Sequence, residues 1–186
     1  MKSDARTKYT KRVLKDSFLQ CLRIKPLNKI TVKEVCAIAE VNRATFYKHY
    51  RDCSDLLEQI ENEMLFSYKN ALKKLDVSDS SAMTKAMLDM IDAHKELFDL
   101  LIYNHIDDTI SNKMLAIAQE VCMDHWNTTM KKASPEVAKM LFTCLSAGLL
   151  RVIINEYGNY NRQEMISFVS DTVRNATAPY ILHNIK

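Results

Sequence analysis

Glycine and proline, the residues that make the sharpest turns, are almost missing from this sequence: it has two Gly and three Pro among 186 residues. A chain with so little glycine has few sites for positive φ, and one with so little proline has few fixed breaks. Hydrophobic residues make up 47% of the chain, which is enough for a buried core. The helix formers Leu, Ala, Met, Lys and Glu are abundant. We therefore expect an all-α protein of about nine helices.

The cysteines and the N-terminal segment favour a reducing compartment. The five cysteines are odd in number and form no CxxC pair, so neither a disulfide framework nor a zinc knuckle fits. The segment MKSDARTKYTKR is polar and leads into no apolar signal region. We find no unbroken run of about 18 apolar residues. We expect a cytoplasmic protein without a membrane span.

Sequence signatures of catalysis and metal binding are absent. The segments His105-x-Asp107-Asp108 and Cys122-x-x-His125 hold potential ligands, but neither completes a four-ligand zinc set. No GxSxG, P-loop or GxGxxG motif occurs. We expect that the protein is not an enzyme and binds neither a metal nor a cofactor.

Charge divides the chain into a basic head and an acidic body. Residues 1–52 carry 13 Lys and Arg against 5 Asp and Glu, whereas residues 53–186 carry 13 against 18. A net charge of +8 on the head and −5 on the body suggests that the head meets a polyanion, although chance clustering gives the same numbers. We place a domain boundary between residues 52 and 53.

Four helices are expected from the head into the body. The first covers about residues 5–23 and ends before Pro26. Thr31 and Glu34 have the spacing of a capping box, so a second helix begins at Val32, and Asn42 caps a third. Ser54 with Asp55 is expected to cap a longer fourth helix that runs to about Leu75. The inward side chains of these helices are expected to be Tyr9, Val13, Phe18, Cys21 and Leu22; Val32, Val35, Ile38 and Ala39; Phe46 and Tyr50; and Leu57, Ile60, Met64, Tyr68 and Leu72.

Five more helices are expected in the body, at roughly 81–93, 95–105, 107–131, 135–157 and 162–179. Ser134-Pro135-Glu136 places an N-cap, a proline at the first helical position and a carboxylate near the positive helix end. Gly158 suits the left-handed position that follows a helix.

The second and third helices together predict a helix-turn-helix, whose second member lies in the major groove of DNA. In RATFYKHY, Phe46 and Tyr50 face inward, so the other side chains meet solvent or DNA. Arg43 can donate two hydrogen bonds to a guanine edge, and Thr45 offers a hydroxyl and a methyl group. Tyr47, Lys48 and His49 suit phosphate oxygens. The alternative is a polar face of a three-helix packing unit.

The order ITVKEVCAIAEVNRATFYKHYRDCSDLL resembles the DNA-binding domain of TetR-family transcriptional regulators, over about residues 6–65. Family-typical residues occur at unbroken spacing: Thr31, Ala39, Val41, Arg43, Thr45, Phe46, Tyr47 and His49. The resemblance implies phosphate contacts from Thr31, Asn42, Tyr47 and His49, and base or near-base contacts from Arg43, Ala44 and Thr45. Three residues depart from the family pattern: Glu40 replaces the turn glycine, Ala44 replaces a glycine of the third helix, and Cys53 replaces a phosphate-binding lysine.

In the same family the remaining helices form an effector-binding and dimerisation domain. The segments AKMLFTCLSAGLLRVIINEYGNYNRQEMISFVSDTV and HKELFDLLI resemble its last two long helices and one of its shorter pocket helices. Two long helices from each subunit would form a four-helix interface, although the same faces could complete one chain's own core. The expected dimer face holds Leu141, Leu145, Gly148, Leu149, Val152 and Ile153 on one helix and Ile166, Val169, Val173 and Ala176 on the other.

Methionines and aromatic residues of the body suit a pliable cavity for a small apolar or amphipathic effector, although ordinary core packing is the alternative for each. The candidate pocket residues are Met87, Met90, Phe98, Leu101, Tyr103, His105, Met114, Cys122 and Trp126. We therefore expect a homodimeric transcriptional regulator that binds double-stranded operator DNA, with repression relieved by the effector. The alternative is a helical ligand-binding co-regulatory protein that keeps the fold without sequence-specific DNA binding.

Overall fold

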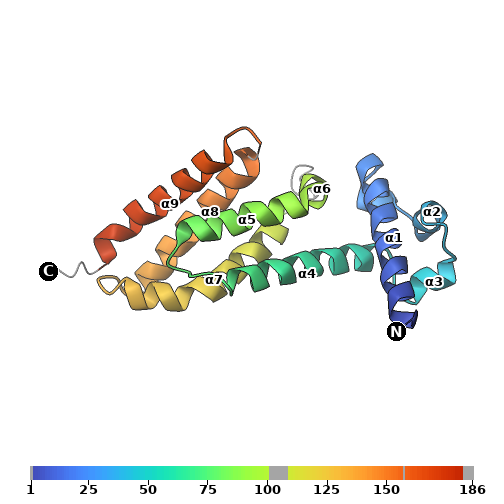
Figure 1. Cartoon of the computed structure of the whole chain (residues 1–186), viewed down its shortest axis with the longest axis horizontal. Coiled ribbons are helices and arrows are strands. Elements are labelled where there is room, and N and C mark those ends of the chain that lie inside the picture. Colours follow the sequence, from blue (N-terminus) through green and yellow to red (C-terminus); the bar gives the residue numbers. More distant parts are fainter. Residues whose placement is uncertain (1, 101–108, 157, 182–186) are drawn as a thin grey trace. The chain divides into compact units, whose positions relative to one another are not determined.

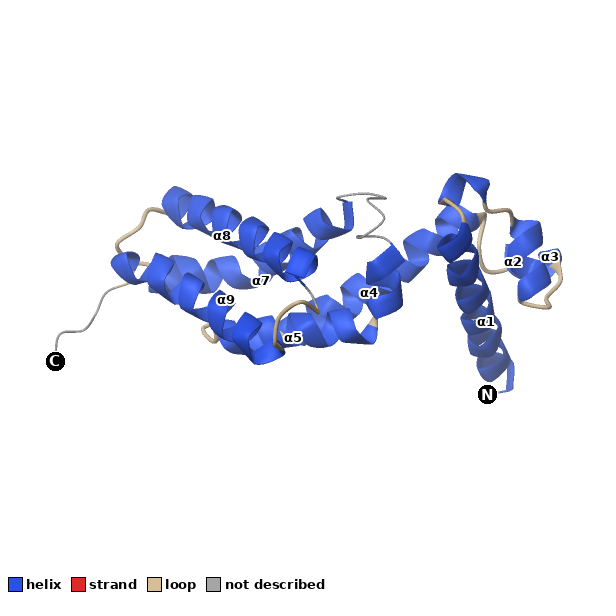
Figure 2. Cartoon of the chain, turned by 90° about the horizontal axis from the view of Figure 1, so that it is seen from above, coloured by secondary structure: helices blue, strands red, loops and turns tan. Residues whose placement is uncertain are grey.

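The computed structural model describes residues 2–100, 109–156 and 158–181, and this part of the chain holds helices and loops but no strand (Figures 1 and 2). The all-α prediction is confirmed. The chain divides into two compact units, residues 1–64 and 65–186. Helix α4 (Cys53–Leu72) begins in the first unit and ends in the second. The units therefore meet inside this helix, whereas the sequence suggests a boundary just before it.

The first unit is built from α1 (Lys2–Ile24), α2 (Val32–Ile38), α3 (Arg43–Tyr47) and the first turns of α4, with the short 3-10 helix η1 (Leu27–Lys29) between α1 and α2. Its core is closed to solvent: five large side chains have no exposed surface. They come from all four α-helices and are Leu14, Phe18, Val35, Phe46 and Leu56. Burial of one such side chain contributes about 1.5–3 kcal/mol, so this core holds the short helices α2 and α3 in place.

Two residues of the predicted inner faces lie at the surface instead, one on α1 and one on α2. On α1 the sequence predicts Tyr9 inside, but its side chain is 61% exposed and stacks against the Arg12 guanidinium, while Leu14 occupies the core. On α2 it predicts Ile38 inside, but Ile38 is 45% exposed and Cys36 is buried. Neighbouring apolar residues both satisfy helical spacing, and only the packing partner decides between them.

The second unit contains α5 (Ser80–Ala93), α6 (Lys95–Phe98), α7 (Thr109–Thr129), α8 (Pro135–Glu156), α9 (Arg162–Thr177) and the 3-10 helix η3 (Ala178–Tyr180). Helix α5 packs against α9, and α7 packs against α8 (Figure 1). The observed helices lie close to the predicted ranges. Residues 101–105 of the predicted sixth helix lie outside the described part.

Short-range capping signals hold in this unit. Val137 N–H donates to the Ser134 hydroxyl at 3.3 Å, and Gly158 adopts φ 88° after α8. Asp79 and Asn161 cap α5 and α9 with side-chain oxygens. These bonds satisfy N–H groups that have no partner within the helix.

Arg162 fastens the start of α9 to α5. Its guanidinium pairs with Asp89 and Asp92 and also donates to the Lys85 carbonyl at 3.3 Å. The three acceptors lie on one face of α5, so a single cation sets the register of the two helices. The partners are substantially exposed, and each ion pair is worth only about 0.2–1 kcal/mol.

Helix α8 is long and apolar enough, by length and composition, to cross a membrane, with a mean hydropathy of 1.8 over its most apolar stretch. An unbroken apolar run is absent from the sequence, so that criterion does not identify this helix. A core helix of a soluble protein passes the same test, but only 28% of this stretch is buried within the chain. Helix α8 therefore presents apolar surface that its own chain leaves uncovered.

Candidate nucleic-acid interface

The capping box that begins α2 is formed as predicted. The Thr31 hydroxyl accepts from Glu34 N–H at 3.4 Å, and the Glu34 carboxylate accepts from Thr31 N–H at 3.0 Å. Hydrogen bonds from the Lys25 ammonium and from Thr31 hold the pKa of Glu34 at about 2, against an ordinary value of 4.5. The carboxylate therefore stays charged at the positive end of α2, and Thr31 stays at the surface.

The turn between α2 and α3 places a glutamate in a conformation that favours glycine. Glu40 has φ 52°, and it is the only non-glycine residue with positive φ in the described part of the chain. Val41 N–H donates to the Cys36 carbonyl at 3.0 Å, and Glu40 N–H donates to the Ala37 carbonyl at 3.4 Å. This pair of bonds defines a Schellman motif, in which glycine is the usual residue at the position of Glu40. The turn is formed without glycine, at a cost of about 1–2 kcal/mol.

Helix α3 is short, with five residues from Arg43 to Tyr47. Asn42 caps it as predicted: its side-chain oxygen accepts from Ala44 N–H at 2.9 Å. Phe46 N–H and Tyr50 N–H continue the backbone bonding to Asn42 and Phe46, at 3.2 and 2.9 Å. The chain therefore keeps a helical path through Lys48 and His49 even where the regular helix has ended.

The two aromatic residues predicted to face inward do so, and their burial determines which other side chains of the segment 42–50 face outward. Phe46 is fully buried, Tyr50 is 2% exposed, and their rings lie 5.6 Å apart. The predicted DNA-contacting side chains divide by exposure. Six are exposed: Thr31, Asn42, Arg43, Ala44, Tyr47 and Lys48. Thr45 and His49 are half-buried.

The Tyr50 ring also receives the ammonium of Lys11, which lies 6.0 Å from the ring centre. The Tyr50 hydroxyl is buried without a hydrogen-bond partner among the described residues, and burial raises its pKa to about 12. The phenol therefore stays neutral and acts as core. Lys11 brings a cation of α1 over the aromatic residue that follows α3.

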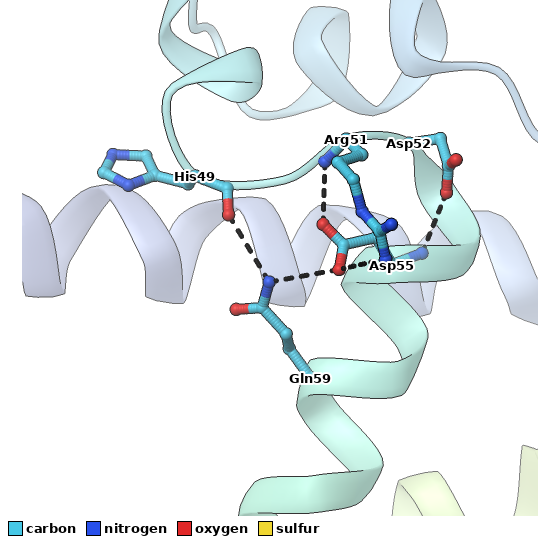
Figure 3. A network of polar contacts seen from close by, with 5 residues as sticks. All are labelled: His49, Arg51, Asp52, Asp55 and Gln59. Carbon is cyan, nitrogen blue, oxygen red and sulfur yellow. Dashed lines mark hydrogen bonds and ion pairs between the residues drawn. The ribbon is translucent and has the colours of Figure 1, made fainter.

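A polar network holds the residues that follow α3, at His49 and Arg51, against α4 (Figure 3). The Gln59 amide donates to the His49 carbonyl at 3.5 Å and to the Asp55 carboxylate at 3.4 Å. Asp55 also accepts from Arg51 N–H at 2.7 Å. His49 is thus fixed through its backbone, which leaves its ring free of this network. The sequence gives no signal for this contact, because Gln59 lies ten residues from His49 in the chain.

The predicted cap of α4 is wrong. Asp52, not Ser54, supplies the capping oxygen, which accepts from Asp55 N–H at 2.8 Å. Both residues are suitable caps by type, and Ser54 lies inside the first turn.

The family's phosphate-binding position at the start of α4 has no counterpart here. Cys53 is 6% exposed, and burial with the nearby Asp52 charge raises its pKa to about 11. A neutral, buried thiol cannot contact a phosphate group. The neighbouring Arg51 is exposed, and its guanidinium lies 3.5 Å from Asp55. Arg51 is the cation closest to this position in the sequence.

The second unit encloses a separate cavity of about 330 Å³. Four of the candidate pocket residues line it: Met87, Met114, Cys122 and Trp126. Met90 and Phe98 are buried but do not contribute to the lining of this cavity. Leu101, Tyr103 and His105 lie outside the described residues. Tyr68, Thr84 and His125 line the cavity without having been predicted, because a tyrosine or threonine on a buried helical face looks like ordinary core.

Metal ligands are not gathered anywhere in residues 2–100, 109–156 and 158–181: no three His, Cys, Asp or Glu side chains there could hold an ion together.

Solved structures with this arrangement are transcriptional regulators. The dihydroxyacetone kinase operon activator DhaS superposes with a TM-score of 0.68 at 12% identity, covering 93% of this chain and 98% of that chain. A transcriptional regulator of the TetR/AcrR family from Aquifex aeolicus VF5 gives 0.59 at 14% identity, with 89% and 98% covered. This chain has the TetR-family fold. A TetR-family regulator from Mesorhizobium loti MAFF303099 gives 0.58 at 16% identity, with 95% and 99% covered.

The likeness to TetR-family structures extends over both units, since it covers about nine-tenths of this chain in each comparison. No family model matches the sequence, and no curated protein matches it either. The TetR fold is therefore carried by helix order and packing, with few shared residues.

Proposed function

We propose that this protein is a transcriptional regulator that binds double-stranded operator DNA as a homodimer, with α3 of each subunit in a major groove. The single observation that carries the proposal is the division of the segment 42–50 into two faces. Phe46 and Tyr50 anchor it to the core, while Arg43, Tyr47 and Lys48 project to solvent. A buried anchor with an exposed basic face is what a groove-binding helix needs.

The proposed roles follow from reach and chemistry. Arg43, at the first position of α3, donates two hydrogen bonds to a guanine edge. Thr45 and Ala44 make contacts with bases or lie close to them. Phosphate groups are bound by Tyr47, Lys48 and His49 in the second half of the segment 42–50. They are also bound by Thr31 and Asn42, which begin α2 and α3. Phosphate contacts fix the position of α3, and Arg43 with Thr45 supplies the sequence preference.

The proposed homodimer forms through α8 and α9. The predicted apolar face of α8 is partly used inside the chain, since Leu145, Leu149 and Ile153 line the cavity. A different stripe faces outward, with Met140 63% exposed, Cys144 and Ala147 exposed, and open space around Gly148. On α9, Ile166 and Val169 are buried, and Phe168 is 52% exposed. We propose that these outward residues form the subunit interface, which brings two copies of α3 to a spacing of about 34–36 Å on DNA.

An effector in the cavity is proposed to act through α4. This helix carries Asp55 and Gln59, which hold the end of the α3 segment, and also Tyr68 and Leu72, which line the cavity. A ligand that favours one position of α4 shifts the population of head arrangements and so changes DNA affinity. Repression relieved by the effector is our proposal. One structural neighbour is an operon activator, so a reporter assay with the isolated operator decides the direction.

Selection of bound fragments from the source genome, followed by gel shifts at two salt concentrations, tests the DNA-binding function. We expect specific retention of a few fragments and a steep loss of affinity with salt, because phosphate contacts release counterions. Tyr47→Phe and His49→Ala should weaken binding to all sequences alike. Uniform weak binding to every fragment would contradict the proposal.

Buried Cys53 favours a second candidate, a ligand-binding co-regulatory protein of the same fold that does not bind specific DNA. The loss of one phosphate contact weakens affinity for every sequence by a similar factor. The Cys53→Lys variant separates the two functions. A regulator gains affinity for the selected fragments, whereas a co-regulatory protein gains only weak binding that does not depend on sequence.

A further inference from the structure

Among the described residues, no charged side chain lines the cavity in the second unit. Helices α4, α5, α7, α8 and α9 all contribute to it, and none of the lining residues that the structure describes is Asp, Glu, Lys or Arg. The Cys122 thiol is 2% exposed, and burial raises its pKa to about 11, so this group also stays neutral. Among the lining residues that the structure describes, only His125 could become a cation. A charged ligand would lose its hydration here without gaining an opposite charge.

Most hydroxyl groups of the lining are already used. Thr84 and Thr177 donate to the carbonyls of Ser80 and Val173, at 2.7 and 2.8 Å, within their own helices. Thr129 donates to the His125 carbonyl in the same way. Because these three hydroxyl groups already donate to backbone carbonyls, they have no hydrogen to donate to a ligand and add little polarity to the cavity.

Two aromatic side chains of the lining carry donors that have no partner among the described residues. Tyr68 is only 5% exposed, and no described residue forms a hydrogen bond with its hydroxyl. Trp126 lies edge-on to Phe142, with ring centres 5.2 Å apart, and no described residue accepts from its indole N–H. Tyr68 and the half-buried Trp126 both line the cavity, so their unpaired phenol and indole groups point to an acceptor atom that arrives with a ligand.

We infer that the cavity binds an uncharged, mainly apolar molecule that carries one hydrogen-bond acceptor, such as an alcohol or ketone oxygen, and that it rejects carboxylates and ammonium ions. The acceptor meets the Tyr68 hydroxyl or the Trp126 N–H, and the methionines around it adapt to the apolar part. The volume lies at the small end of ligand sites, which fits a molecule of modest size. That this ligand acts as an effector rests on the proposed function. That the cavity binds it does not.

The protein carries its own reporter for this test. Trp126 is the only tryptophan of the chain and lines the cavity, so its fluorescence responds to occupancy. The full-length protein is titrated at about pH 8, where histidine is normally neutral, with three probes of equal chain length: decanol, decanoate and decylammonium. We expect saturable binding of decanol, and affinities at least about tenfold lower for the two ions.

Matched variants separate the cavity from the rest of the surface. Ala118 lines the cavity on α7, and Ala116 on the same helix is exposed, so Ala118→Phe fills the site and Ala116→Phe adds the same group outside it. We expect Ala118→Phe to abolish decanol binding and Ala116→Phe to leave it unchanged. Tyr68→Phe, which keeps the ring, should weaken decanol binding by roughly threefold to tenfold.

Equal affinity for decanol and decanoate, or decanol binding that survives Ala118→Phe, would overturn the inference. The absence of any saturable response to decanol would also overturn it. Gel shifts on the same preparations, with the genomic fragments and without any probe, report the DNA-binding function separately. DNA binding with no ligand response would remove the inference alone, and a ligand response without specific DNA binding would remove the proposed function alone.

Discussion

Replacement of Glu40 by glycine should make the first unit more stable. Glu40 holds φ 52° in the turn between α2 and α3, a conformation that costs a side-chain-bearing residue about 1–2 kcal/mol. Glycine removes this cost. It also makes the unfolded chain more flexible, which takes back about 0.4–1 kcal/mol. The midpoints of the two effects leave a net gain of about 0.8 kcal/mol.

The assay must report on the first unit, and tryptophan fluorescence cannot, because the only tryptophan lies at position 126. Hydrogen exchange of the full-length protein, followed by mass spectrometry of peptides from α1 and α2, reports on it directly. A gain of 0.8 kcal/mol corresponds to exchange that is roughly fourfold slower for the most protected amides. Peptides from α7 and α8 should exchange at the wild-type rate.

Glu58→Gly is the matched control, because Glu58 is exposed in the interior of helix α4. There the same substitution lowers helix stability by up to about 1 kcal/mol, so exchange should become faster. Opposite effects of one substitution at two sites would tie the gain to the backbone conformation of Glu40. Slower exchange in both variants, or faster exchange in Glu40→Gly, would refute the reasoning.

Two further predictions concern the two units separately. The pKa of Glu34 is lowered to about 2 from 4.5, so its carboxylate stabilises the folded state above pH 4.5, and this contribution disappears as the pH falls toward 2. The difference in unfolding free energy between wild type and Glu34→Gln, measured by urea unfolding followed by circular dichroism, should therefore be constant above pH 4.5 and shrink below it; a difference independent of pH would contradict this assignment. In the second unit, Cys144 is exposed while the other four cysteines are buried, so a thiol reagent should modify one site in the folded chain. If α8 forms the dimer interface, the labelling rate of Cys144 should fall as protein concentration rises, and a rate independent of concentration would argue against that interface.

The parts of the fold that the sequence predicts well depend on contacts between near neighbours. Thr31 with Glu34, Asn42 with Ala44, and Ser134 with Val137 each form a cap within three residues, so residue type and spacing determine the bond. The aromatic pair Phe46 and Tyr50 is of the same kind, because only one helical turn separates the two residues. These signals were enough to place the helix-turn-helix and its outward face.

The parts that the sequence does not predict depend on partners far along the chain. Tyr9 and Ile38 have suitable helical spacing, but the neighbouring helices cover Leu14 and Cys36 instead. Helix α8 is apolar on several faces, so the sequence could not show that Leu145 and Leu149 line a cavity while Met140 and Cys144 face outward. The type of a residue does not show which distant side chains will pack against it, or whether it will lie beside a cavity.

The most direct test of the central claim compares the affinities of wild type and Arg43→Ala for two duplexes, a selected operator and a scrambled sequence of the same length. Both duplexes are measured at the same salt concentration. If Arg43 of α3 contacts a base, the variant should lose about 1–3 kcal/mol on the operator and much less on the scrambled duplex, so that the ratio of the two affinities falls. Lys131→Ala, which removes one exposed positive charge from the second unit, should leave the ratio unchanged. Equal losses on both duplexes in the Arg43 variant, or no operator found by selection, would contradict the account.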